Sequence, residues 1–234
     1  MIFNGYDFSE YLRVNPTRRL AAPIDTITKS VPGMDGDIFM RAQLKPLVIP
    51  VRVRLNLPSM DHRNVALIRR KITSKLVTAK PAKLILPDEP DLHYIAKLTG
   101  ASDLTNLWST GSADLEFTAF EPVAYGRERT AVVGPSTTLN VGGTWQTKPT
   151  FALTATTTGK VKVLNADTQE FVLLHANVAT GAKVTIDMQA QTVRVNSNLA
   201  VVDVSSDFFA LAPGENDIRI TGATGSITWT ERWI

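Results

Sequence analysis

The sequence predicts a mainly β protein with an α+β N-terminal domain, containing one helix and strand hairpins, and a C-terminal β-sandwich or jelly roll. Three observations predict this fold class: apolar residues at every second position of several segments, one amphipathic helical stripe in the first half, and many short β-rich runs in the second half. The 234 residues, of which 44% are hydrophobic and 20% charged, provide enough chain for two folded domains.

Alternation of apolar and polar residues predicts the strands of the first half. Residues 38–45 and 51–57 both follow the period of two that is typical of a strand with one buried face. Pro50 is expected at the start of the second strand, where its missing backbone donor does least harm. The turn-forming residues 87–91 predict a hairpin between the β-rich runs on either side, and residues 115–120 predict a last strand.

One helix is expected between these strands. Asp61 is placed to cap its first turn, and the helix is expected to continue to about Thr78. One face carries an apolar stripe at helical spacing, which indicates packing on the domain core. The stripe consists of Val65, Ile68, Ile72 and Leu76. The opposite face carries Arg69, Arg70, Lys71 and Lys75. Such a basic face is usually solvated, and its best functional interpretation is a contact with an acidic neighbouring subunit.

Composition changes near residues 126–135, where charges and prolines give way to threonine, valine and alanine. Gly134-Pro135-Ser136 is interpreted as a linker, so the predicted domains are residues 1–130 and 131–234. The second half contains no predicted helix, and turn signals separate its β-rich runs, as in a sandwich or jelly roll. These runs lie near residues 151–155, 161–164, 171–174, 184–188, 193–195, 208–211, 218–220 and 227–233.

Charge and composition argue against several classes of function. The formal net charge of +3 is too small to indicate nucleic-acid or membrane binding, and the absence of cysteine excludes disulfides, thiol nucleophiles and cysteine metal sites. Asp7, Glu10 and Arg13 interrupt the N-terminus, so no secretory signal is expected there. No apolar run reaches the roughly 20 residues that a membrane-spanning helix needs. No membrane insertion is therefore expected.

Ionisable residues do not form a recognisable catalytic or metal-binding motif. The three histidines are far apart in sequence and lack the paired spacing of zinc ligands. Asp88, Glu89 and Asp91 form a local acidic cluster between two prolines, which is typical of a solvated turn, whereas glycosidase carboxylates come from separate elements facing a cleft. The chain is therefore expected to be no enzyme and to need no metal or cofactor.

The tryptophans of the second half raise the alternative of carbohydrate binding, because aromatic faces stack on sugars. Ile227, Trp229 and Trp233 fall on one face of the terminal strand, which is typical of side chains facing a sandwich core. Trp145 lies outside this strand and is the candidate glycan contact. A carbohydrate-binding adhesin module thus stays open as an alternative, and so does a glycan hydrolase built on the scattered carboxylates of this half.

Several segments resemble the distal tail proteins (Dit) of siphophages, in the order in which that family has them. Near the N-terminus these are residues 3–12, with the sequence FNGYDFSEYL, and residues 31–36, with the sequence VPGMDG. Residues 84–94 and 96–100 resemble the central segment of Dit N-terminal domains. Residues 181–187, 211–218 and 231–234 resemble the C-terminal domain of the family.

This resemblance implies a structural hub of the phage tail tip rather than an enzyme. Six N-terminal domains would form a hexameric ring that continues the tail tube and connects it to the baseplate, and galectin-like C-terminal sandwiches would project outward. The implied partners are the tail-tube protein, the tail-associated lysin or fibre hub, and a receptor-binding protein used in host adsorption. DNA would pass through as cargo without sequence readout. The protein would be assembled in the host cytoplasm and located in the virion.

A closed ring needs two complementary surfaces on each subunit. Under the resemblance, Gly33, Asp35 and Gly36, and the hairpin arms around residues 41–53, are expected to contact a neighbouring subunit through strand edges. The expected contacts in these arms are Arg41, Arg52 and Arg54. Four aromatic residues are expected to anchor the N-terminal segment and to contribute to the ring contact, because a terminus frays unless it is held. They are Phe3, Tyr6, Phe8 and Tyr11.

Overall fold

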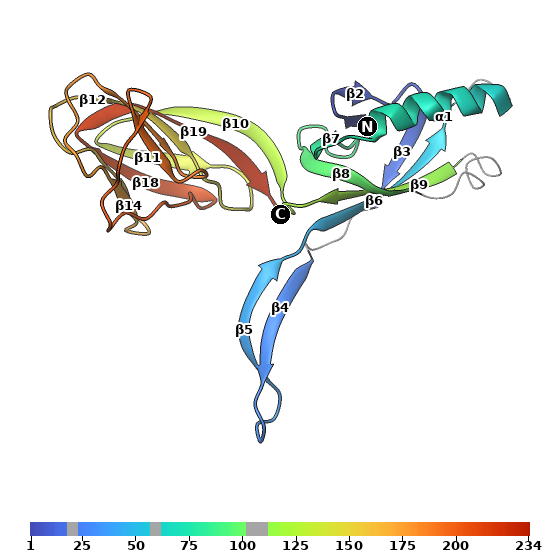
Figure 1. The fold of residues 1–234 in the computed structure, drawn as a ribbon, viewed down its shortest axis with the longest axis horizontal. Coiled ribbons are helices and arrows are strands. Elements are labelled where there is room, and N and C mark those ends of the chain that lie inside the picture. The colour runs from blue at the N-terminus through green and yellow to red at the C-terminus, as the bar shows by residue number, and fades with distance from the viewer. Residues whose placement is uncertain (18–22, 57–61, 102–111) are drawn as a thin grey trace. The chain divides into compact units, whose positions relative to one another are not determined.

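The structure is a computed structural model that describes residues 1–17, 23–56, 62–101 and 112–234 (Figure 1). It divides the chain into two compact units, residues 1–124 together with residue 234, and residues 125–233. Both units are built mostly from antiparallel strands, and one α-helix lies in the first. The predicted mainly β fold class is therefore confirmed. Among the described residues, no helix is both long enough and apolar enough to span a membrane.

The N-terminal unit is organised around a seven-stranded sheet with the order β2-β1-β7-β8-β9-β6-β3. The strands are β1 (Ile2–Phe3), β2 (Tyr6–Asp7), β3 (Leu12–Pro16), β6 (Leu47–Leu55), β7 (Ala82–Ile85), β8 (Tyr94–Ala101) and β9 (Ser112–Ala119). The predicted hairpin on either side of residues 87–91 is confirmed as β7 and β8, in which Leu84 lies opposite Tyr94. The predicted last strand is confirmed as β9.

This sheet must curl, because its two outer strands are joined by a short connection. Asp7 ends β2 and Leu12 begins β3, at opposite ends of the strand order. Six spacings in a flat sheet amount to about 29 Å, whereas five residue steps reach at most about 18 Å. Backbone hydrogen bonds hold the short connection between β2 and β3. The amide of Phe8 donates to the carbonyl of Met1 (3.0 Å), and the amide of Leu12 donates to the carbonyl of Phe8 (2.8 Å).

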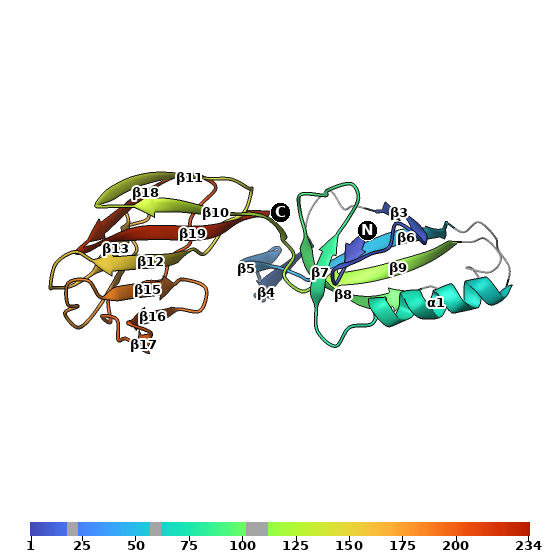
Figure 2. The same cartoon turned by 90° about the horizontal axis from the view of Figure 1, so that it is seen from above.

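Helix α1 (His62–Leu76) lies beside β8 and β9 (Figure 2) and packs on the core of this sheet. Ile72 and Leu76 from the predicted stripe are buried in the same core as Phe3 and Phe117. The helix ends two residues before the predicted end at Thr78. The predicted cap Asp61 and the side chain of Val65 lie outside the described residues.

Strand β6 confirms the predicted alternation but begins earlier than expected. It starts at Leu47, so Pro50 lies inside the strand and not at its start. The carbonyl of Pro50 accepts a hydrogen bond from the amide of Thr17, just past the end of β3. The nitrogen of Pro50 faces the same side, where the ladder with β3 has ended at Pro16, so its missing donor interrupts no pairing there.

Strands β4 (Ile24–Ser30) and β5 (Asp37–Leu44) form a separate two-stranded sheet. The strand predicted from the alternation over 38–45 is confirmed, but the expectation of one buried face is wrong in the single chain. Nearly every residue of both strands is exposed, because neither strand pairs with the seven-stranded sheet (Figure 1). A bulge in the pairing also places Ile38 and Ala42 on opposite faces, so the exposed apolar side chains do not lie on a single side.

The C-terminal unit is a two-sheet sandwich without a helix. Its six-stranded sheet has the order β10-β19-β12-β15-β16-β17, and its four-stranded sheet has the order β11-β18-β13-β14. The strands are β10 (Ala124–Val133), β11 (Ser136–Val141), β12 (Thr150–Ala155), β13 (Lys162–Asn165), β14 (Phe171–Leu173), β15 (Lys183–Asp187), β16 (Thr192–Val195), β17 (Asn198–Leu199), β18 (Gly214–Thr221) and β19 (Ala223–Trp233). Both sheets contribute side chains to one continuous buried core.

Two sequence predictions for this region differ from the structure. Residues 208–211 form no strand: Phe209 and Leu211 are buried in the core, but the backbone contributes only an isolated bridge between Leu211 and Thr147. Residues 134–135 form a turn between β10 and β11 and not a linker, because β10 pairs with β19 in the same sheet. The units consequently meet at residue 124, six residues before the predicted division.

Candidate functional site

The β4–β5 hairpin presents an uncovered apolar surface. Ile24, Phe39 and Met40 have about 60% of their side-chain surface exposed, and Ile27 and Ile38 are also exposed. By the register of the hairpin, Ile24 and Phe39 lie on one face, and Ile27 and Ile38 lie on the other. Exposed large apolar side chains on both faces are typical of an element that another chain covers. The outer edges of β4 and β5 also carry backbone donors and acceptors that none of the described strands pairs. Arg41, one of the predicted contact residues, lies in β5 opposite Ile27 and is exposed as well.

The hairpin tip contains the predicted contact residues Gly33, Asp35 and Gly36. Both glycines have a φ of 84°, a left-handed conformation that glycine adopts without strain, so the sequence here matches the turn it must form. The amide of Met34 donates to the carbonyl of Val31 and closes the turn. Asp35 is exposed at this tip. The turn thus holds one carboxylate and one apolar side chain, that of Met34, away from the strands.

Arg52 and Arg54 lie on the exposed face of β6, opposite in direction to the buried Val51 and Val53. The Arg52 guanidinium donates to both carboxylate oxygens of Asp114, at 2.8 and 3.3 Å. These hydrogen bonds raise the pKa of Arg52 and lower the pKa of Asp114. The side chain of Arg52 is consequently held in place on the sheet.

A third arginine, which was not among the predicted contact residues, also belongs to this site. Arg13 in β3 lies directly opposite Arg54, and Asn15 lies opposite Arg52. Together with Val14, these four residues line a surface pocket of about 300 Å³, which we call the arginine pocket. The sequence alone does not bring Arg13 close to Arg54, because their proximity depends on the antiparallel register of β3 and β6.

The four predicted N-terminal aromatic residues divide into two pairs. Phe3 and Phe8 are fully buried in the core of the N-terminal unit, and the rings of Tyr6 and Phe8 lie 4.9 Å apart. Tyr6 and Tyr11 are partly exposed and contact helix α1: Lys71 donates to the Tyr11 hydroxyl at 2.6 Å, and Lys75 lies over the Tyr6 ring. A ring contact by these residues stays a prediction, and only Tyr6 and Tyr11 retain surface for it.

Trp145, the candidate glycan contact, is partly buried beside the end of β19. Its backbone amide donates to the carbonyl of Arg232 at 3.0 Å, which fixes this segment against the last strand. A glycan contact by Trp145 stays a prediction. Trp229, in contrast, is 6% exposed and belongs to the sandwich core together with Ile227, as the alternation indicated. The same expectation is wrong for Trp233, which is 36% exposed near the end of the strand and lies outside that core.

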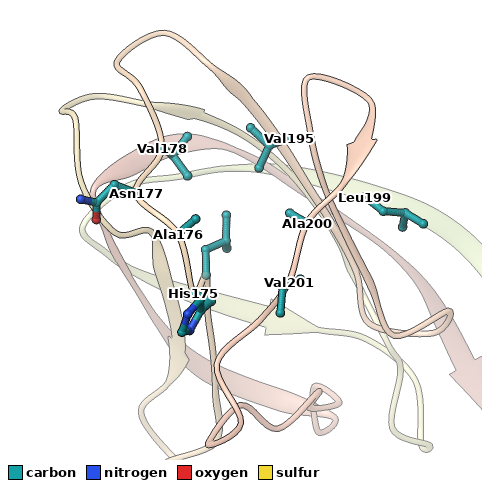
Figure 3. Close-up of a pocket in the computed structure, with 9 residues that line it drawn as sticks. His175, Ala176, Asn177, Val178, Val195, Leu199, Ala200 and Val201 are labelled. Atoms are coloured by element: carbon teal, nitrogen blue, oxygen red, sulfur yellow. The ribbon is translucent and has the colours of Figure 1, made fainter.

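The C-terminal unit also contains a pocket of about 410 Å³ that lies between residues 174–178 and 195–201 (Figure 3). Most lining side chains are aliphatic, and Trp145 is not among them. His175 and Asn177 are the polar members, and the Nδ1 atom of His175 lies 3.9 Å from a carboxylate oxygen of Asp203. Such a lining offers few hydrogen-bonding groups to a sugar.

The acidic cluster of residues 88–91 lies in the connection where a turn was predicted. Asp88, Glu89 and Asp91 connect β7 and β8. Within the described residues, no group of three or more histidine, cysteine, aspartate or glutamate side chains is arranged to hold a metal ion.

Comparison with known proteins identifies both units. Residues 6–119 match a family model described as a phage tail protein RIFT-related domain, and residues 142–233 match one described as the C-terminal domain of a siphovirus-type tail component. The crystal structure of the Dit protein of phage SPP1, described as a paradigm of the hub adsorption apparatus in phages that infect Gram-positive bacteria, is similar over 100% of this chain and 98% of that chain, with a TM-score of 0.85 and 18% identity.

A weaker similarity connects the chain to the baseplate of phage P2 in its activated conformation with calcium. It has a TM-score of 0.45 and 8% identity, and it covers 97% of this chain and 91% of that chain. A search of curated protein sequences finds no significant match.

Proposed function

Because the chain belongs to the siphophage distal tail protein family, we propose that it forms a hexameric ring at the tail tip through its N-terminal units. The ring joins the tail tube to the baseplate and to the tail-associated lysin or fibre hub, with a receptor-binding protein as a further partner. It has no catalytic role and leaves a passage for DNA, which it holds without reading its sequence. The finished ring is part of the virion and is assembled in the host cytoplasm.

The observation that carries this proposal is the uncovered β4–β5 hairpin. A two-stranded ribbon with apolar side chains on its surface is marginal in water unless something packs on it. Head-to-tail contact with a neighbouring subunit would cover Ile24, Phe39 and Met40 and would pair a free strand edge. Repetition of this heterologous contact closes a ring when the rotation per subunit is fixed.

Replacing residues 24–44 by a short Gly-Ser linker is expected to abolish self-association while leaving both units folded. The hairpin contributes no strand to the seven-stranded sheet, so its removal costs that sheet no pairing. Sedimentation velocity should show a ring for the full chain and a monomer for the shortened chain, with unchanged circular dichroism per residue of the remaining chain. A full chain that stays monomeric at every concentration, with and without its tail partners, would contradict the proposal.

A further inference from the structure

The arginine pocket and the hairpin tip are complementary in charge and lie on different parts of the N-terminal unit. We propose that the tip of one copy docks in the arginine pocket of the next copy, with the Asp35 carboxylate between Arg13 and Arg54. This inference rests on the proposed ring and names the contact that joins its subunits.

The first support is the placement of two like charges in one cross-strand pair. Arg13 and Arg54 face each other in register on the exposed side of β3 and β6. Like charges at directly opposed positions destabilise a sheet. Within the part of the chain that the structure describes, neither arginine forms an ion pair. The local arrangement is unfavourable for a lone subunit and becomes favourable when an anion enters between the two guanidinium groups.

The second support is the distribution of charge and polar groups around this pair of arginines. Asp114 already neutralises and orients Arg52, so the positive charge without a partner is concentrated on Arg13 and Arg54. Asn15 adds an amide that donates or accepts, whereas the side chain of Val14 points to the other side of β3 and packs on the core. A volume of about 300 Å³ accommodates a side chain rather than a small ion alone. The pocket therefore suits the carboxylate of an acidic side chain.

The hairpin tip provides such a carboxylate. Asp35 and Met34 are adjacent and exposed, and Met34 is exposed by 54%. Asp35 forms no ion pair within the described residues, whereas Asp37 accepts a hydrogen bond from the Thr28 hydroxyl inside the hairpin. The hydrogen bond from the Met34 amide to the Val31 carbonyl orders the tip as a turn, which reduces the entropy lost on docking. The Asp35 carboxylate can therefore enter the pocket between Arg13 and Arg54.

The geometry of the contact favours a second copy over the same chain. Tip and pocket are different surfaces, so a contact between copies is heterologous and generates a ring, as the proposed function requires. Strand β4 has seven residues and extends about 23 Å, which carries the tip well clear of the hairpin base. One charged contact of this kind per interface also fixes the register of the apolar hairpin surfaces around it.

Charge reversal at either side tests the contact. Arg13→Glu and Asp35→Arg are each expected to raise the dissociation constant for self-association by about tenfold or more, because one partner of a charge-assisted contact is lost. Arg13→Glu should also raise the melting temperature of the N-terminal unit slightly, since it replaces an opposed like-charge pair by an opposite-charge pair with Arg54. A variant that weakens assembly while stabilising the subunit is the signature of this inference.

The triple variant Arg13→Glu, Arg54→Glu and Asp35→Arg should recover most of the lost association, because it restores opposite charges across the interface. Arg194→Glu and Asp207→Lys, on exposed positions of the C-terminal unit, serve as matched controls and should leave association unchanged. Association should be measured by sedimentation velocity at two salt concentrations.

The outcomes separate this inference from the proposed function. If the unaltered chain assembles and neither charge reversal changes its dissociation constant, the tip–pocket contact is wrong and the ring proposal stands. If both reversals weaken assembly but the triple variant recovers nothing, Asp35 and the arginines do not contact each other, and the inference is also wrong. If the unaltered chain never assembles, both proposals are wrong.

Discussion

Phe3→Ala is expected to lower the free energy of unfolding of the N-terminal unit by about 3–5 kcal/mol, the usual cost of truncating a fully buried phenylalanine. Phe3 is 0% exposed, and its ring centroid lies 5.1 Å from that of Phe117. Strand β1 has only two residues, so few backbone hydrogen bonds hold it between β2 and β7. The buried side chain of Phe3, together with that of Phe8, therefore supplies much of the attachment of the N-terminal segment.

Hydrogen exchange measured on peptides is the suitable readout for Phe3→Ala, because it reports each unit separately. Protection should fall in the peptides that contain β1 and β7 and stay unchanged in residues 125–233. Tyr6→Ala is the matched control on the same segment: Tyr6 is partly exposed, so its loss should cost less than half as much. Equal effects of the two substitutions would show that burial of Phe3 does not hold the segment.

A double-mutant cycle with Phe117→Ala refines this result. The two rings contact each other, so their separate effects should not add. A coupling of about 0.5–1.5 kcal/mol is expected for a buried aromatic pair. Strict additivity would indicate that Phe3 acts only through the volume it fills.

The strands were predictable because alternation depends on neighbouring residues alone. The sequence therefore located β5 closely and detected β6 but not its start at Leu47, and only β6 has a buried face in the single chain. Alternation states that one side of a strand is apolar, but not which element covers that side. For β6 the cover is the unit's own core, and for β5 we propose the neighbouring subunit.

The arginine pocket was only half predictable, because it depends on contacts between distant segments. Arg52 and Arg54 stood out through their alternation with buried valines, but Arg13 joins them only through the antiparallel register of β3 and β6.

Residues 208–211 show that a sequence can predict burial correctly and strand pairing wrongly. Phe209 and Leu211 have the composition of a strand and the burial of a strand, yet no second strand runs beside them to form a ladder. Local sequence indicates burial there, and only the tertiary arrangement decides the hydrogen bonding.

Gly225→Ala is expected to destabilise the C-terminal sandwich by about 3 kcal/mol, at the upper end of the cost of overpacking. Gly225 lies in β19 opposite Leu153 of β12. A Cβ atom added there would lie 2.8 Å from the Cα of Leu153 and would collide with the carbonyl oxygen of Ala152. These are backbone atoms of a strand that also pairs with β15, so β12 cannot move aside without breaking its second ladder.

The matched control is Gly134→Ala in the turn between β10 and β11, where an added Cβ meets no atom within 4 Å. Gly134→Ala is expected to leave the free energy of unfolding of the C-terminal sandwich unchanged or to raise it by about 0.4–1 kcal/mol, because alanine has less conformational freedom than glycine in the unfolded chain. Denaturant unfolding followed by tryptophan fluorescence in a Trp108→Phe background separates the two cases, since the three remaining tryptophans all lie in residues 125–233. Equal midpoints for the two alanine variants would show that β12 and β19 can separate at Gly225 without cost. The central pairing of the sandwich would then not be the rigid element that the close backbone approach implies.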